Sequence, residues 1–181
     1  MKLIIGAGNT VSDGWIATQE SSLNLLNPND FMCHLNGELA DAMLAEHVWE
    51  HMTINDGLLA AKNCYDFLKH GGYIRCAVPD AYFRNEWYQN MVQIGGPGPS
   101  DHPAYTHKVL YNYRTFRKVF SDVGFDVELL EYCDEEGRFH YKHWNNFDGH
   151  IGRSFRFDTR NSTDNLGMVS IIIDAKKPLI I

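Results

Sequence analysis

The segment His47-Val48-Trp49-Glu50-His51 carries two imidazoles and a carboxylate within five positions. On a helix, His47 and His51 would face the same side and could bind zinc, with Glu50 as the base of a hydrolase. The alternative is that these histidines cap or pack at a junction between a strand and a helix. The motif therefore indicates a candidate site, and its chemistry depends on the local backbone.

A second group of titratable side chains lies in the segment 100–108, which follows a loop rich in glycine and proline. Histidine exchanges a proton near neutral pH, so His107 is a candidate general base. Asp101 or His102 would orient its imidazole. The alternative is a loop of solvated polar residues without a chemical role.

Three further candidate positions directly follow predicted strands. They are Gly6-Ala7-Gly8-Asn9, Glu46-His47 and Pro79-Asp80. A glycine turn allows the backbone to approach a ligand closely. In open α/β sheets, ligands bind beyond the carboxyl ends of the strands. We therefore expect these positions to meet at one edge of a sheet.

Residues 138–160 differ from the remainder of the chain in composition and belong to a predicted insertion over residues 138–167. The segment 138–160 holds five basic and two acidic residues together with six aromatic ones. Arginine binds phosphate or carboxylate, and aromatic faces stack on sugar rings or bases. The sequence predicts an insertion that recognises an anionic or nucleotide-linked sugar, with Arg153 and Arg156 in contact with it. The alternative is an irregular loop that packs over the sheet and serves homodimerisation.

Hydrophobic periodicity predicts the elements that position these residues. A helix starts at Thr53, which has capping-box spacing to Asp56, and ends with Lys69-His70 before two glycines. Another helix starts at Asn112, and Asn27-Pro28-Asn29-Asp30 predicts a turn. Strands are predicted over residues 2–5, 15–18, 40–45, 73–78, 125–129 and 168–175. Strands that alternate with helices predict one α/β domain over residues 1–181, built on an open and mostly parallel sheet.

The composition excludes several classes of protein. The 181 residues include 44% hydrophobic and 22% charged ones, as in ordinary globular domains. The net charge of −7 disfavours bulk binding to nucleic acid or to an anionic membrane. Four isolated cysteines and the absence of a long apolar run predict a cytoplasmic protein.

Four motifs follow one another along the first half of the chain. They are Leu3-Ile4-Ile5-Gly6-Ala7-Gly8-Asn9, Gly14-Trp15-Ile16, the segment from Asp41 to Glu46-His47-Val48-Trp49-Glu50-His51, and the segment from Leu68-Lys69-His70-Gly71-Gly72 to Val78-Pro79-Asp80. This succession resembles the class I S-adenosylmethionine (SAM)-dependent methyltransferases, and is similar to their short, type 11-like members. The resemblance covers residues 2–132, and residues 168–175 suit the antiparallel last strand of the family.

The resemblance implies a Rossmann-like fold, SAM as cofactor, and methyl transfer to a small-molecule or glycan hydroxyl. It implies that Gly6, Ala7 and Gly8, with Asn9 beside them, border the methionine part of SAM. It places Glu46 and His47 at the mouth of the cofactor cleft and Asp80 near the acceptor. No metal is part of this interpretation.

The sequence departs from the family in three places. Ile4 replaces an acidic residue that many members carry two positions before the first glycine. The acid that binds the ribose has Glu20 as its nearest counterpart, with Gln19 as an alternative. Asp41 follows Gly8 by only 33 positions, and a βαβ unit alone takes about 30, so we expect a trimmed sheet.

These departures keep a second class of function open, a catalytically silent SAM-fold module that binds a nucleoside or a partner. The zinc hydrolase is the third.

Overall fold

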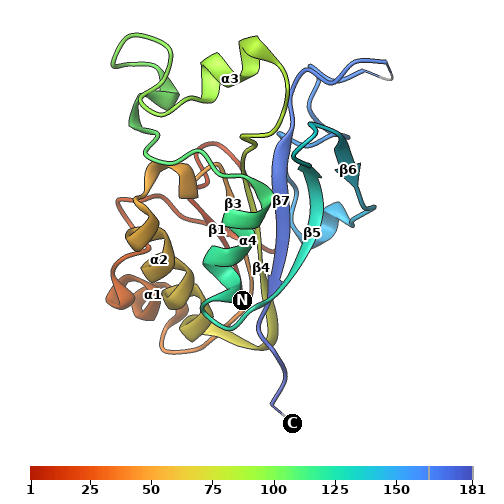
Figure 1. Ribbon diagram of the computed structural model, residues 1–181. Coiled ribbons are helices and arrows are strands. Elements are labelled where there is room, and N and C mark those ends of the chain that lie inside the picture. The colour runs from red at the N-terminus through yellow and green to blue at the C-terminus, as the bar shows by residue number, and fades with distance from the viewer. Residues whose placement is uncertain (163, 181) are drawn as a thin grey trace.

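The computed structural model describes residues 1–162 and 164–180. Its centre is a seven-stranded sheet with the strand order β2-β1-β3-β4-β7-β5-β6 (Figure 1). The strands are β1 (Lys2–Ile5), β2 (Ile16–Ala17), β3 (Ala40–Glu46), β4 (Leu68–Pro79), β5 (Asp126–Cys133), β6 (Phe139–Tyr141) and β7 (Ser170–Lys176).

Most strands of the sheet run in one direction. β1 pairs in parallel with β2 and β3, and β3 pairs in parallel with β4. β7 is antiparallel to both β4 and β5, so β5 runs in the direction of β4. β6 is antiparallel to β5. The predicted open, mostly parallel α/β sheet with an antiparallel last strand is confirmed.

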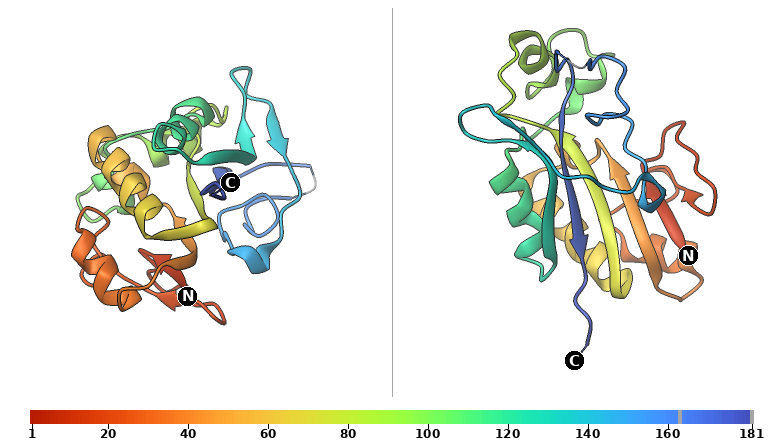
Figure 2. Two further views of the ribbon diagram at one scale, coloured as in Figure 1. Left: turned by 90° about the horizontal axis from the view of Figure 1, so that it is seen from below. Right: turned by 90° about the vertical axis from the view of Figure 1, so that its right-hand side faces the viewer.

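Three helices cover one face of the sheet: α1 (Pro28–Leu35), α2 (Ile54–Phe67) and α4 (Tyr113–Ser121) (Figure 1, Figure 2). Their apolar side chains pack on alternate residues of the strands, which all point to the same face. Thr53 caps α2 and Asn112 caps α4 as predicted. The predicted turn at residues 27–30 is instead a helix start, because Asn27 is the N-cap of α1 and proline suits the first helical position.

The end of α2 also differs from the prediction. The helix stops at Phe67, and Lys69 and His70 already belong to β4. The cation at this helix end is Lys177, whose Nζ donates to the carbonyls of Tyr65 and Leu68 at 2.8 and 2.9 Å. A cation beside carbonyls at a helix C-terminus is stabilising. Lys177 is distant from α2 in sequence, so the hydrophobic periodicity of the helix cannot predict this contact.

The connection between β1 and β2 explains the short spacing from Gly8 to Asp41. Residues 6–15, all described, link these two parallel strands by turns without a helix. The expected loss of an element from the sheet is thus located between β1 and β2.

The second face of the sheet is covered by residues 142–162 and 164–169, which we call the cover segment (Figure 2). Trp144 and Ile151 of this segment pack on Ile4, Leu44 and Ile172 of the strands. The cover segment is irregular apart from η3 (Asn146–Asp148). A face that would otherwise expose apolar side chains is thereby buried without a long helix.

Polar side chains from the strands fasten the cover segment by its main chain. The fully buried Glu131 accepts from the N–H of Phe155 at 2.8 Å, and Glu46 accepts from the N–H groups of Gly152 and Arg153. Arg75, 2% exposed, donates to the carbonyls of Asn145 and Gly149, both at 2.8 Å. Buried polar groups of an irregular segment need such partners.

A third layer lies over the carboxyl ends of the strands (Figure 1). It consists of α3 (Glu86–Val92), η2 (Pro103–Thr106) and the loop between them. η1 (Trp49–His51) follows β3 below this layer. None of the helices in the described ranges has the length and apolar character required to cross a bilayer.

Candidate functional site

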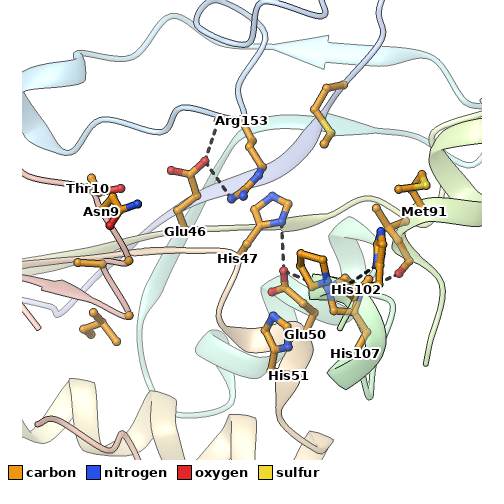
Figure 3. A pocket seen from close by; sticks show the side chains of 18 of the residues that line it. Asn9, Thr10, Glu46, His47, Glu50, His51, Met91, His102, His107 and Arg153 are labelled. Carbon is orange, nitrogen blue, oxygen red and sulfur yellow. Dashed lines mark hydrogen bonds and ion pairs between the residues drawn. The ribbon is translucent and has the colours of Figure 1, made fainter. Parts of the chain in front are cut away.

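A cavity of about 490 Å³ lies between the carboxyl ends of β1 and β3 and the layer of α3 and η2 (Figure 3). Its volume is in the range of small-molecule and cofactor sites. The walls combine the glycine turn after β1, the end of β3 with η1, and side chains from α3, η2 and the cover segment. The polar residues among them are Asn9, Thr10, Glu46, His47, Glu50, His51, His102, His107, Arg153 and Arg160.

The glycine turn forms one wall through its backbone. Gly6 and Gly8 have φ angles of +58° and +55°, a region that side chains with a Cβ disfavour. A Cβ at Gly6 would lie 2.9 Å from Cγ2 of Val48, whereas one at Gly8 would meet no atom within 4 Å. The backbone at Gly8 is therefore open to a ligand.

Gln19 fixes this turn. Its side-chain amide accepts from the N–H of Gly8 at 3.2 Å and donates to the carbonyl of Gly8 at 2.8 Å. Gln19 is thus engaged with the turn itself. Glu20, the other candidate for binding the ribose, is exposed and is not among the residues that line this cavity.

Glu46 and Arg153 place opposite charges side by side in the cavity wall (Figure 3). The N–H of Arg153 donates to Oε1 of Glu46 at 2.7 Å, and Nη1 of Arg153 lies 3.7 Å from the same oxygen. The Arg153 side chain is half exposed. Such a pair can receive both ends of a zwitterion.

His47 sits at the turn from β3 to η1 with a φ of +55°, which is uncommon for a residue with a side chain. Both ring nitrogens face partners: Nε2 lies 2.9 Å from Oγ of Ser170, and Nδ1 lies 3.1 Å from Oε1 of Glu50. The strained backbone thus brings an imidazole next to a carboxylate.

Glu50 has a fully buried carboxylate. Neither of its oxygens has a hydrogen-bond partner among the described residues, although Nδ1 of His47 lies within ion-pair distance of Oε1. Burial is the largest single influence and raises the pKa of Glu50, but His47, a backbone N–H and His51 together outweigh it, so the pKa lies below its usual value. The site therefore contains a buried carboxylate without a hydrogen-bond partner among the described residues.

His107 and His51 flank this carboxylate. Nδ1 of His107 donates to the carbonyl of Val92 at 2.9 Å, and its Nε2 lies 4.0 Å from Oε1 of Glu50. The ring of His51 meets that of His107 edge to face at 4.8 Å, and its Nδ1 lies 2.7 Å from Oγ1 of Thr106. Burial lowers the pKa of His51 more than Glu50 raises it, so its neutral form is favoured.

The main chain keeps these groups together. The carbonyl of Glu50 accepts from the N–H groups of Lys108 and Val109, at 2.7 and 3.2 Å. Two segments that lie more than fifty residues apart in sequence are thereby joined next to His51 and His107.

The helical zinc motif requires His47-x-x-Glu50-His51 to lie on a helix, and this condition is not met. Only Trp49–His51 form a single 3₁₀ turn, and the positive φ of His47 reverses the chain before it. His47 and His51 are therefore not successive residues on one helical face. Glu50 instead approaches His107, which the motif does not contain.

Of the residues predicted to form the site, most line the cavity. These are Gly6, Ala7, Gly8, Asn9, Glu46, His47, His102, His107 and Arg153. Among the described residues, the polar partner of His107 that orients its ring is the Val92 carbonyl rather than Asp101 or His102. Asp101 is exposed outside the lining, and Nδ1 of His102 accepts from the N–H of Ala104, which caps η2.

Asp80 and Arg156 have structural positions instead. Asp80 is fully buried, and its oxygens accept from the N–H groups of Tyr82 and Cys133 at 2.9 and 2.6 Å. The guanidinium of Arg156 lies over the rings of Trp144 and Phe157, within the cover segment. Neither residue lines the cavity, so their predicted contact with an acceptor has no support in the geometry.

Two contributors to the site were not predicted. α3 supplies Trp87 and Met91, and the cover segment supplies Arg160. The sequence does contain a signal for the start of α3. Asparagine is a favoured N-cap residue, and the side chain of Asn85 accepts from the N–H of Tyr88. For Arg160 only the basic composition of the segment gives a hint.

The strand order, the antiparallel β7 between β4 and β5, and a cavity at the carboxyl ends of β1 and β3 define the class I SAM-dependent methyltransferase fold. A SAM-dependent methyltransferase from Archaeoglobus fulgidus superposes with a TM-score of 0.55 at 16% sequence identity, over 97% of this chain and 85% of that one. An O-methyltransferase family protein from Burkholderia thailandensis superposes with a TM-score of 0.50 at 11% identity, over 91% of this chain but only 36% of that one.

No family model matches the sequence, and no curated protein matches it at a significant level. Because the two solved structures are only 16% and 11% identical to this chain, their similarity establishes the fold alone.

Proposed function

We propose that this protein is a SAM-dependent methyltransferase that binds SAM in the cavity beside the glycine turn and acts on a small-molecule or sugar hydroxyl. The observation that carries the proposal is the position of this cavity in this fold, between the carboxyl ends of β1 and β3 and against a backbone wall at Gly8. Ligands of open α/β sheets bind at that edge.

The residues of the cavity fit the cofactor. A ligand with an amino-acid end needs one negative and one positive group, and Glu46 and Arg153 supply them next to the glycine turn. The open space at Gly8 leaves room for direct contact with the main chain. These residues would hold the methionine part of SAM, whose sulfonium supplies an electrophilic methyl group.

The chain's own contribution is to orient the acceptor, exclude water and receive a proton. We assign the proton-accepting role in the metal-free protein to His107. Its Nδ1 donates to the carbonyl of Val92, which leaves Nε2 in the neutral ring with a free lone pair on the cavity side. α3 and η2 roof the cavity and would shield the reacting atoms from water.

Cofactor binding is tested by calorimetric titration of the full chain with SAM and S-adenosylhomocysteine. Gly8→Leu fills the open space in the cavity wall and is expected to weaken binding at least 30-fold, or about 2 kcal/mol. Gly37→Leu is the matched control, because Gly37 has a φ of +79° and equally open surroundings but does not line the cavity. Equal affinity in both variants, or no binding by the wild type, would refute the proposal.

Two observations support a second function. Gln19, the alternative candidate for the ribose, is already bound to Gly8, and the position of the missing acid, Ile4, is buried. A silent SAM-fold module would bind the cofactor but form no S-adenosylhomocysteine with any acceptor. A screen of hydroxyl acceptors that follows release of S-adenosylhomocysteine distinguishes the two functions.

A further inference from the structure

We propose that Glu50, His51 and His107 form a binding site for one divalent transition-metal ion of the zinc type in the wall of the cavity. One ligand atom from each residue lies within 4.8 Å of those of the other two. The site goes beyond the proposed methyl transfer, and metal binding does not depend on SAM.

The unsatisfied carboxylate of Glu50 is the first argument. Both oxygens are buried, and neither has a hydrogen-bond partner among the described residues. A buried carboxylate in such a position is costly unless a cation or several donors compensate it. Its nearest cationic candidate, His47, approaches only Oε1, so a metal ion would give the carboxylate the partner that the protein lacks.

The second argument is the way the two histidines are held. Nδ1 of His107 is fixed by the Val92 carbonyl, and Nδ1 of His51 by the hydroxyl of Thr106. Histidine ligands of metals commonly donate one ring N–H to such a partner while the other nitrogen binds the ion. In both residues this leaves Nε2 as the free ring nitrogen, and that of His107 lies 4.0 Å from Oε1 of Glu50.

The distances require only a modest contraction. Tetrahedral zinc with bonds of about 2.1 Å separates its ligand atoms by roughly 3.4 Å. The present separations reach 4.8 Å, and that between His107 Nε2 and Glu50 Oε1 is 4.0 Å. The main-chain bonds from Lys108 and Val109 to the carbonyl of Glu50 already hold the two segments together, so the contraction needed is confined to about 1.4 Å between ligand atoms.

Two imidazoles and one carboxylate select borderline ions such as Zn²⁺, Co²⁺ or Fe²⁺ over Mg²⁺, which prefers oxygen ligands. Three protein ligands leave a coordination position open toward the cavity. If the proposed function holds, that position is where an acceptor oxygen would bind. A bound ion would occupy the lone pair of His107, so this residue would then be a ligand and not a base.

The ligand set differs from that of the helical His-x-x-Glu-His motif, which uses His47 and His51 and leaves Glu50 as a base. His47 is not a ligand here, since its two nitrogens face Ser170 and Glu50. The two metal sites can therefore be told apart by substitution.

The test is a titration of the chelator-stripped full chain with Zn²⁺ by calorimetry and with Co²⁺ by visible absorption, with Mg²⁺ as a comparison. We expect one Zn²⁺ per chain with a dissociation constant below 1 μM, and a Co²⁺ spectrum of tetrahedral type. His107→Ala and Glu50→Gln are each expected to weaken Zn²⁺ binding at least 100-fold. His102→Ala, in the same cavity, should change it less than threefold. His47→Asn, which tolerates a positive φ, should still bind one Zn²⁺ per chain, because His47 is not a ligand.

Circular dichroism of each variant establishes that it folds, and His107→Ala decides the question if Glu50→Gln does not fold. Absence of stoichiometric Zn²⁺ binding by the wild type, or undiminished binding by His107→Ala, would overturn the proposal. Loss of binding in His47→Asn with retention in His107→Ala would point to the helical motif instead. Binding of S-adenosylhomocysteine is measured in a separate titration. Loss of cofactor binding and loss of Zn²⁺ binding are therefore distinguished from each other.

Discussion

Replacement of Arg75 by methionine is expected to destabilise the protein strongly, because this buried guanidinium joins the sheet to the cover segment. Arg75 makes four hydrogen bonds. Two go to the carboxylate of Asp174, both at 2.7 Å, and two to the carbonyls of Asn145 and Gly149. Its plane also lies over the ring of Trp144 at 4.8 Å. Methionine preserves much of the aliphatic packing and removes all four bonds.

The magnitude follows from what is left unpaired. Removal of one partner of a buried ion pair costs roughly 3–5 kcal/mol. Water reaches part of Asp174, whose side chain is 24% exposed, so the lower end of this range applies. We expect Arg75→Met to lower the free energy of unfolding by about 3 kcal/mol, which for a chain of this size lowers the melting temperature by roughly 6–12 °C.

Urea unfolding followed by circular dichroism measures this loss. Lys62→Met is the control, because it removes a cation from a pair with Asp66 in which both side chains are well exposed. Its expected cost is below about 0.5 kcal/mol. Asp174→Asn in the Arg75→Met background should recover part of the loss, since it neutralises the abandoned carboxylate. A cost for Arg75→Met within 1 kcal/mol of the control would refute this account of how the cover segment is held.

Three further predictions concern stability. Burial raises the pKa of Asp80 from 3.8 to about 6, so the folded protein holds this proton more tightly than the unfolded chain. The protonated carboxyl contributes on the order of 3 kcal/mol to stability below pH 4, and this contribution is lost as the pH rises through 6. The free energy of unfolding in urea should therefore fall over this pH range in the wild type and not in Asp80→Asn. Thr53→Ala removes the acceptor that caps α2 and should cost about 1 kcal/mol in the same assay, with Thr159→Ala, exposed in the cover segment, expected to cost less. Lys177→Met removes two charged hydrogen bonds to the end of α2 and should cost about 2 kcal/mol; a melting temperature equal to that of the wild type would contradict that role.

The sequence alone predicts those parts of the fold that depend on local signals. The starts of α2 and α4 follow from the side chains of Thr53 and Asn112, which cap within three residues. β1, β5 and β7 follow from hydrophobic runs or alternation. The sequence predicts a turn where α1 begins, because asparagine followed by proline is equally typical of a turn and of a helix N-terminus.

The site is predictable only in outline. Ligands of open α/β sheets bind beyond the carboxyl ends of the strands, and this rule predicts that the glycine turn and Glu46-His47 lie close together. Both line the cavity. The sequence does not predict that Glu50 lies next to His107. The main-chain hydrogen bonds between residues 50 and 108–109 are long-range contacts that leave no pattern in the sequence. The backbone of His47 likewise could not be anticipated, since nothing in its neighbours signals a positive φ.

The attachment of the cover segment has a consequence for how this protein can change. Glu46, Glu131 and Arg75 recognise peptide N–H and carbonyl groups of that segment, which every residue but proline provides in full. The identities of most exposed side chains there are therefore not constrained by the fastening. Since the same segment contributes Arg153 and Arg160 to the cavity, substitutions in it can change the cavity lining while the sheet and its fastening points stay constant. The stability of this small domain and the chemistry of its cavity wall can therefore be altered independently.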